Sequence, residues 1–237
     1  VLDERKAKAR LTTRRARPQR RPPVLEARAI NQVWTWDITY LPSPVRGAYF
    51  YLYTIQDLFS RKIVGWSVEA AEDGSLAKEL FDRILSERIQ FPEKLRVHAD
   101  NGSPMRSKSL TGLFANLKVR CTHGRPRVSD DNAFIESWFS VLKGRASFPD
   151  FFADIDQARR YIASIVAWYN GEHMHSRLDY LTPQQMDLGE GPRIQKRRNE
   201  VIQRAWADRP TRFGAKRLRL RVPNAVKLTF HETVSYA

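Results

Sequence analysis

The chain has 237 residues, of which 42% are hydrophobic, and a single cysteine. This length allows one domain of ordinary size plus extensions. No apolar run approaches the ~20 residues that span a bilayer, and the N-terminus has no signal-peptide pattern, so we expect a soluble intracellular protein. One cysteine excludes an internal disulfide, and five histidines argue against a Cys/His zinc module. We therefore expect any bound metal to have oxygen ligands.

The net charge of +15 comes from the two flanks of the chain. Residues 1–28 carry 10 Lys or Arg against 3 Asp or Glu, residues 190–221 carry 11 against 3, and the 161 residues between them hold 19 of each sign. Such flanks are typical of segments that neutralise nucleic-acid phosphates, although solubilising tails or ribosomal-type RNA binding would give the same pattern. The candidate DNA-binding residues of the first flank are Arg14, Arg15, Arg20 and Arg21.

From Ile30 onward the sequence predicts regular structure. "VWTWDITY" alternates, with Trp34 and Trp36 on one side and Asp37 on the other, which indicates a strand. Two more strand patterns, "AYFYLYTIQD" and "KIVGWSVE", complete a predicted antiparallel meander. A capped amphipathic helix, "DGSLAKELFDRILSERI", then leads to a short buried strand, "KLRVHAD".

The second part of this region predicts mainly helices. A short helix at about residues 108–116 and a strand, "KVRCT", precede the helix "SDDNAFIESWFSVLKGR", and "DIDQARRYIASIVAWYN" makes a last long helix. This order predicts an α/β domain with a mixed sheet and helices on its faces. We therefore divide the chain into a basic arm (1–28), the α/β domain (29–189) and a basic extension (190–237). The extension contains "RLRLRVPNAVKLTF", which alternates like a small β element.

Three carboxylates occupy positions that suggest function. Asp37 interrupts a hydrophobic strand, where aspartate is depleted and costly to bury, although a solvated face would also explain it. Asp100 ends a buried strand, where ligands of α/β sheets gather, although an Asp-Asn-Gly corner is also an ordinary turn. Glu136 shares a polar arc of its helix with Ser140 and Lys143, which suits either a solvated face or a face turned towards a substrate.

The spacing of these acids, with 62 residues between Asp37 and Asp100 and 35 between Asp100 and Glu136, resembles that of the DDE family. "VWTWDITYLP", "VHADNGS" and "SDDNAFIESWFSVLK" resemble the acid-bearing motifs shared by retroviral integrases and insertion-sequence transposases. "YTIQDLFSRKIVGWSV" and "WYNGEHMHSRLDYLTPQQM" resemble two further family segments. The resemblance is closest to the OrfB half of two-frame insertion elements and covers about residues 28–190. Ala99 replaces a frequent serine.

The resemblance implies an RNase H-like fold with a mixed five-stranded sheet flanked by helices. It also implies a DDE polynucleotidyl transferase that cleaves and joins DNA at insertion-element ends, with Asp37, Asp100 and Glu136 as catalytic and metal-binding residues. Three clustered carboxylates need a cation, and oxygen ligands suit Mg²⁺ or Mn²⁺. Two such ions per site would activate the nucleophile and stabilise the leaving oxygen.

Other residues receive secondary roles. Lys143 would lie in the same groove as Glu136 and contact DNA, as a lysine at this offset does in integrases. Asn132 at the helix start is a candidate phosphate contact, and Arg177 is a candidate DNA contact by resemblance alone. For His98 we expect a structural role, and for Asp57 a role in a hairpin turn.

The expected partners are element-end and target DNA, a second copy of the chain on DNA, and a helix-turn-helix protein from an upstream reading frame. No such motif is visible in residues 1–28. No membrane partner is expected, and the expected location is the bacterial cytoplasm, at the nucleoid. Two alternatives share these features: an RNase H-type nuclease without strand transfer, and an inactive DNA-binding remnant.

Overall fold

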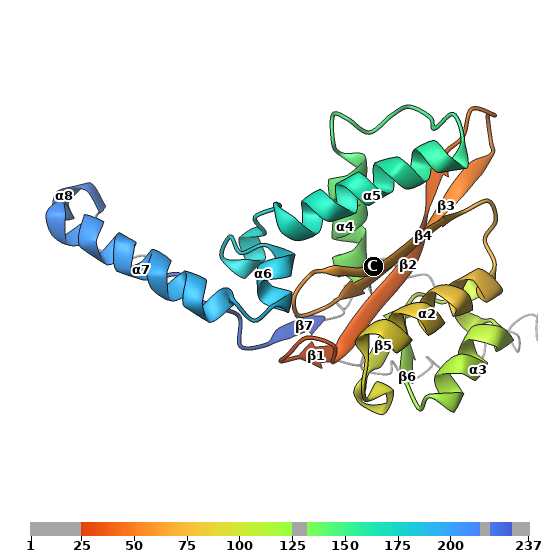
Figure 1. Cartoon of the computed structure of the whole chain (residues 1–237), viewed down its shortest axis with the longest axis horizontal. Helices are drawn as coiled ribbons and strands as arrows, with labels where there is room; N and C mark the ends of the chain where they lie inside the picture. Colours follow the sequence, from red (N-terminus) through yellow and green to blue (C-terminus); the bar gives the residue numbers. More distant parts are fainter. Residues whose placement is uncertain (1–24, 125–131, 214–218, 229–237) are drawn as a thin grey trace, which may run out of the picture.

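The computed structural model describes residues 25–124, 132–213 and 219–228, and a five-stranded sheet lies at its centre (Figure 1). Its strands are β2 (Val33–Pro42), β3 (Tyr49–Asp57), β4 (Ile63–Glu69), β5 (Arg96–Ala99) and β6 (Arg120–His123). The strand order is β4-β3-β2-β5-β6. β2, β3 and β4 are antiparallel, whereas β5 and β6 run parallel to β2. The predicted mixed five-stranded sheet is confirmed.

Helices cover both faces of the sheet, as Figure 1 shows. On one face lie α2 (Gly74–Arg88) and α3 (Lys108–Asn116), and on the other lie α4 (Ala133–Lys143) and α5 (Ile155–Gly171). The alternation in β2 sorts its side chains as predicted, because Trp34 and Trp36 are buried beneath α2 and α3. Short 3-10 turns connect these elements: η2 (Pro92–Lys94), η3 (Pro104–Arg106) and η5 (Ser176–Leu178).

The turn between β3 and β4 is built around the buried carboxylate of Asp57. Its Oδ1 accepts hydrogen bonds from the backbone N–H of Ser60 at 2.7 Å and the Ser60 hydroxyl at 2.8 Å, and its Oδ2 accepts one from the N–H of Asn31 at 2.7 Å. Burial raises the pKa of Asp57, and the hydrogen bonds oppose that shift. These contacts give Asp57 the turn role that the sequence predicted.

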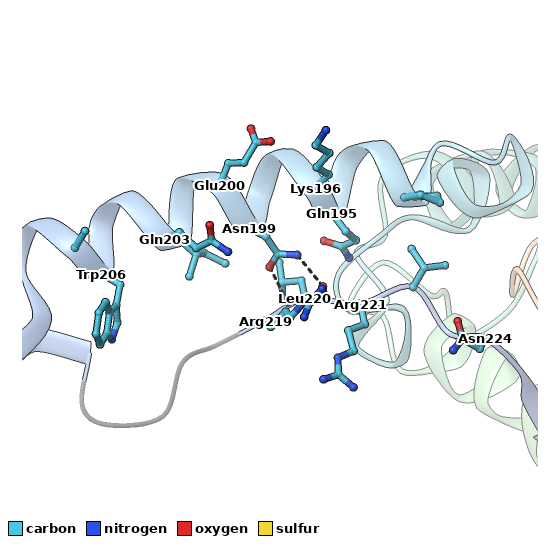
Figure 2. Close-up of a pocket in the computed structure, with 14 residues that line it drawn as sticks. Gln195, Lys196, Asn199, Glu200, Gln203, Trp206, Arg219, Leu220, Arg221 and Asn224 are labelled. Carbon is cyan, nitrogen blue, oxygen red and sulfur yellow. Dashed lines mark hydrogen bonds between the residues drawn. The ribbon is translucent and has the colours of Figure 1, made fainter.

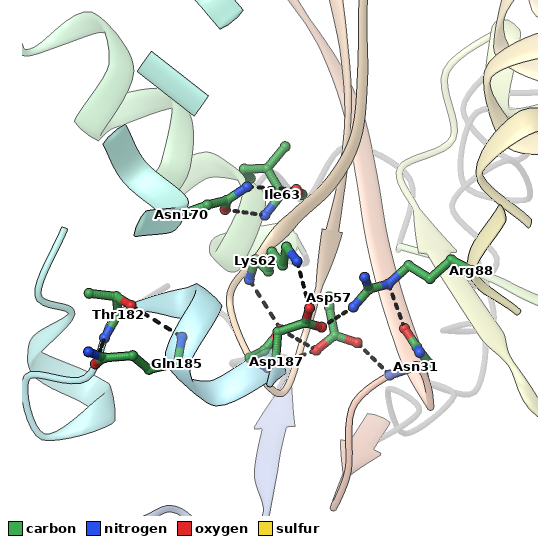
Figure 3. A network of polar contacts seen from close by, with 10 residues as sticks. Asn31, Asp57, Lys62, Ile63, Arg88, Asn170, Thr182, Gln185 and Asp187 are labelled. Carbon is green, nitrogen blue, oxygen red and sulfur yellow. Dashed lines mark hydrogen bonds and ion pairs between the residues drawn. The ribbon is translucent and has the colours of Figure 1, made fainter. Parts of the chain in front are cut away.

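A polar cluster joins this turn to α2 and to α6 (Pro183–Asp187), as Figure 3 shows. The Asp187 carboxylate accepts from Lys62 Nζ at 2.6 Å and also pairs with Arg88, whose Nε donates to Asn31 Oδ1 at 3.0 Å. Only 6% of the Asp187 side chain is exposed. Removing one member of such a buried group leaves uncompensated charge, so the cluster specifies how these elements meet.

The last part of the described chain adds a projecting helix and a small second sheet. α7 (Gly191–Asp208) extends away from the sheet and is followed by α8 (Pro210–Phe213), while β1 (Leu25–Ala27) pairs antiparallel with β7 (Val226–Leu228) (Figure 1). Asn199 of α7 forms two hydrogen bonds of 2.9 Å with the backbone of Leu220 (Figure 2), and both residues line a groove of about 1120 Å³. The sequence alone predicts no helix over residues 191–208, so α7 is a feature that only the structure shows. Across the described ranges, no helix has the length and apolar character needed to cross a membrane.

Candidate active site

Asp37 and Asp100 come from neighbouring parallel strands. β2 pairs with β5 so that Thr35 lies opposite His98. Asp37 lies two residues beyond Thr35, and Asp100 lies two residues beyond His98. Because paired strands are ~4.8 Å apart, this register brings the two carboxylates together at the C-terminal end of the strand pair.

The environment of Asp37 links it to both other predicted acids. Its side chain is half-buried on the sheet face that α4 covers. Burial raises the pKa of Asp37 to about 7, against the hydrogen bond of 2.8 Å that its Oδ1 accepts from the Ile38 N–H. The negative charges of Asp100 and Glu136 contribute to this raised pKa. The three carboxylates therefore interact electrostatically.

Glu136 is brought to this place because α4 is attached to β2 near both ends. Asn132, the residue before α4, is 3% exposed, and its Nδ2 donates to the backbone carbonyl of Trp36 at 3.1 Å. Lys143, the last residue of α4, donates from Nζ to Thr39 Oγ1 at 2.7 Å. Asp37 lies between these two attachment points on β2.

Asp100 begins the loop that follows β5. It is exposed, and its Oδ1 accepts from the Gly102 N–H at 2.8 Å. This contact forms the Asp-Asn-Gly turn that was the alternative role for Asp100, and it occupies one carboxylate oxygen. His98 is buried, with Nδ1 3.0 Å from Thr122 Oγ1, which agrees with its expected structural role.

The three side chains suit a divalent cation by their chemistry. All are carboxylates, the donors that Mg²⁺ and Mn²⁺ prefer, and a cation would relieve the repulsion that raises the pKa of Asp37. Within the ranges that the structure describes, no three His, Cys, Asp or Glu side chains are gathered in an arrangement for holding a metal ion.

The predicted DNA contacts fall in different places. Lys143 is exposed beside Asp37, and burial of its amine lowers the pKa of Lys143 whereas the charge of Asp37 raises it. Arg177 is exposed on η5. Asn132 is directed at the backbone of β2, so its contacts are those of a residue that holds α4. The four candidates of the basic arm lie outside the described residues: Arg14, Arg15, Arg20 and Arg21.

Sequence reasoning did not single out Thr39, the partner of Lys143. A usable signal existed, since Thr39 is two residues beyond Asp37 and therefore on the same face of its strand. A buried threonine there is otherwise unremarkable, which is why the pattern alone gave it no role.

The strand order, the helices on both faces and the acids after β5, on β2 and on α4 define an RNase H-like domain. Comparison with known proteins agrees. An integrase core domain model matches residues 27–129, and a second model of the same description matches residues 117–183. The chain belongs to the integrase core domain family, together with insertion-sequence transposases.

Curated relatives and solved structures give the extent of the likeness. The chain is 31% identical to the transposase for insertion sequence element IS904 of Lactococcus lactis, over 73% of this chain and 67% of that protein. It is 28% identical to transposase InsF for insertion sequence IS3A of Escherichia coli, over 66% of this chain and 54% of that one. The chain thus spans between about half and two thirds of these relatives.

Two solved structures share the fold. A simian T-cell lymphotropic virus intasome in complex with a PP2A regulatory subunit matches with a TM-score of 0.55 and 16% identity, over 72% of this chain and 60% of that one. The HTLV-2 integrase catalytic core domain in complex with magnesium, in its trimeric form, matches with a TM-score of 0.51 and 15% identity, over 67% and 97%.

Proposed function

We propose that this chain is a DNA transposase that cleaves strands at insertion-element ends and joins them to target DNA. The observation that supports this most is that the charges of Asp100 and Glu136 act on the pKa of Asp37. The three acids come from separate elements of an integrase core. Isolated surface acids would not act on the pKa of Asp37 in this way. The insertion-sequence relatives supply the class of DNA substrate.

In this proposal Asp37, Asp100 and Glu136 hold two Mg²⁺ or Mn²⁺ ions. The HTLV-2 integrase core, which shares the fold, was solved with magnesium. Such ions, when bound, activate an attacking oxygen and stabilise a departing one. Asp37 has to be ionised to act as a ligand, and its raised pKa of about 7 means that it gives up its proton as a cation binds.

The other residues of the site bind and orient the DNA. Lys143 stands on the same flank of α4 as Glu136, and Thr39 fixes its amine beside Asp37. A phosphate at the carboxylates would lie within reach of this ammonium group, which would hold the strand in register. Asn132 fixes the start of α4, and so the position of Glu136, without touching DNA.

Partners follow from the reaction. Joining two element ends to one target calls for at least two copies of the chain on DNA, and the HTLV-2 integrase core, which shares the fold, was solved in a trimeric form. Recognition of a specific end sequence would come from a helix-turn-helix protein of an upstream frame and from the basic arm that contains Arg14, Arg15, Arg20 and Arg21.

The test is a strand-transfer assay on labelled element-end DNA with Mg²⁺ or Mn²⁺, comparing the wild type with Glu136→Gln. This change keeps the size of the side chain but removes its charge. Glu79→Gln, an exposed glutamate of α2, is the matched control. We expect joined products from the wild type and the control, and none from Glu136→Gln. Cleavage without joining would identify a nuclease instead, and equal joining by all three proteins would remove Glu136 from the site.

A further inference from the structure

A second group of polar side chains lies beside α4, on the side of α5. We call it the basic cluster; its members are Arg61, Arg145, His173, His175 and Arg177. The Arg61 guanidinium lies 3.7 Å from the ring centre of Phe134, and the Arg145 guanidinium lies 3.8 Å from that of Trp168. The His173 ring stacks on Tyr169 at 5.2 Å and meets His175 edge-on at 5.8 Å.

The basic cluster has no acidic partner within the described residues: none of its members forms an ion pair there. Arg61 is only 6% exposed, yet its Nε and Nη1 have no hydrogen-bond partner, and neither has Nε of Arg145. Asp57 acts on Arg61 electrostatically, but Ser60 and Asn31 already occupy its oxygens.

The pKa shifts of the two histidines also indicate that the cluster lacks an acidic partner. Burial, together with the charges of Arg61, His173 and Arg177, lowers the pKa of His175 to about 4. Burial likewise lowers the pKa of His173, with Arg145 adding to the effect. No acid opposes either shift. The site is therefore strongly positive even with both imidazoles neutral.

The cluster and the carboxylates flank the same helix. On α4, Phe134 and Trp138 face the cluster, whereas Glu136, 200° around the helix from Phe134 at ~100° per residue, faces away from it. The exposed residues on the arc between the two flanks are all small, namely Ala133, Ser137, Ser140 and the C-cap residue Gly144. Because a helix is ~10 Å across, a strand lying over this arc would bridge the two flanks.

We propose that Arg177 and His175, with Arg61 beneath them, bind a backbone phosphate of the DNA strand that crosses α4. This rests on the proposed function, which makes DNA the substrate. Arg177 is exposed and free to form charge-assisted hydrogen bonds, while Arg61 adds a fixed positive charge below. The small residues of α4 let the strand approach closely, so one phosphate can lie at the carboxylates and another at the basic cluster.

The test is the salt dependence of DNA binding in metal-free buffer, measured by fluorescence anisotropy with a labelled duplex and the full chain. Loss of one phosphate contact should reduce the slope of log Kd against log salt by about one for Arg177→Ala. Arg160→Ala, an exposed arginine near the start of α5, removes the same charge and should leave the slope unchanged. His175→Ala should weaken binding to the same extent at pH 6 and at pH 8, because the lowered pKa of His175 keeps its imidazole neutral at both.

Equal slopes for Arg177→Ala and Arg160→Ala would overturn the proposal, since only net charge would then matter. Inorganic phosphate should compete with DNA less strongly for Arg177→Ala than for the wild type; equal competition would also count against the site. Because binding is measured without metal, the result is independent of strand transfer. An inactive wild type with the expected slopes would remove the transposase proposal and leave the phosphate site.

Discussion

Replacing Asn132 by alanine tests whether this residue holds the active site together or touches DNA. Asn132 precedes α4 as its N-cap residue, a place where an asparagine side chain usually accepts a hydrogen bond from the helix. Here it donates to the carbonyl of Trp36 instead, and no helix N–H caps onto it. Its Oδ1 has no hydrogen-bond partner among the described residues, so the bond from Nδ2 to β2 is the polar contact that the substitution removes.

The expected loss of stability follows from that bond. Asn132→Ala leaves the Trp36 carbonyl without its side-chain donor, which costs ~1–3 kcal/mol for a buried group. For a chain of this size ~2 kcal/mol corresponds to a fall in Tm of ~4–8 °C. The start of α4 would also move relative to Asp37, so strand transfer should fall by about tenfold or more even well below Tm, because small misplacements of catalytic groups are that costly.

The matched control is Asn199→Ala. Asn199 also forms side-chain hydrogen bonds with backbone, to Leu220 (Figure 2), but it lies on α7, which extends away from the sheet (Figure 1). Thermal melts followed by circular dichroism and strand-transfer assays at a common low temperature should show both variants destabilised and only Asn132→Ala impaired in joining. If Asn132→Ala melted like the wild type but bound DNA more weakly, the residue would be a DNA contact and the reasoning would fail.

Three further predictions concern charge and hydrogen bonding. Because the folded-state pKa of Asp37 is raised to about 7, its contribution to stability is full below its unfolded pKa and is lost as pH rises through 7. In metal-free buffer at pH 8, Asp37→Asn should therefore have a higher urea midpoint than the wild type. Equal midpoints at that pH would contradict this. Thr39→Val removes the acceptor of Lys143, so joining should fall severalfold with DNA affinity nearly unchanged, as a titration of labelled DNA would show. Asp187→Ala should lower stability by ~3–5 kcal/mol, since Lys62 and Arg88 lose their shared partner. A urea midpoint close to that of the wild type would mean that water replaces the carboxylate.

The strands were predictable from sequence because each obeys a local rule. In β2 the alternation of residues separates Trp36 from Asp37, and the buried faces follow that division. Which strands become neighbours is a different matter. The parallel register of β2 with β5, which brings Asp37 near Asp100, depends on pairing between segments more than 60 residues apart. No local pattern encodes that pairing, and the spacing of the acids suggested it only through resemblance to a family.

The long helix α7 shows what a composition-based view misses. Residues 191–208 are so rich in charge that composition alone assigns them to a basic extension. Yet Ile194, Val201 and Ile202 recur at helical spacing, which is a weak helix signal. Tertiary contacts support the helix, because the Asn199 side chain holds the segment that contains Leu220 against α7. That contact joins two parts of the same extension and could not be inferred from either part alone.

Asp37 and Arg61 explain why the carboxylate site was visible in the sequence and the buried part of the basic cluster was not. An acid inside an apolar strand is conspicuous, because its cost is evident from its neighbours in the chain. An arginine in a hairpin turn looks ordinary, since arginines in turns are usually exposed. Arg61 becomes unusual only when Phe134, distant in sequence, packs against its guanidinium and tertiary packing buries it with two nitrogens that lack partners. Binding sites whose charge is buried by tertiary packing therefore leave no local trace in the sequence, and it is the unsatisfied atoms in the structure that reveal them.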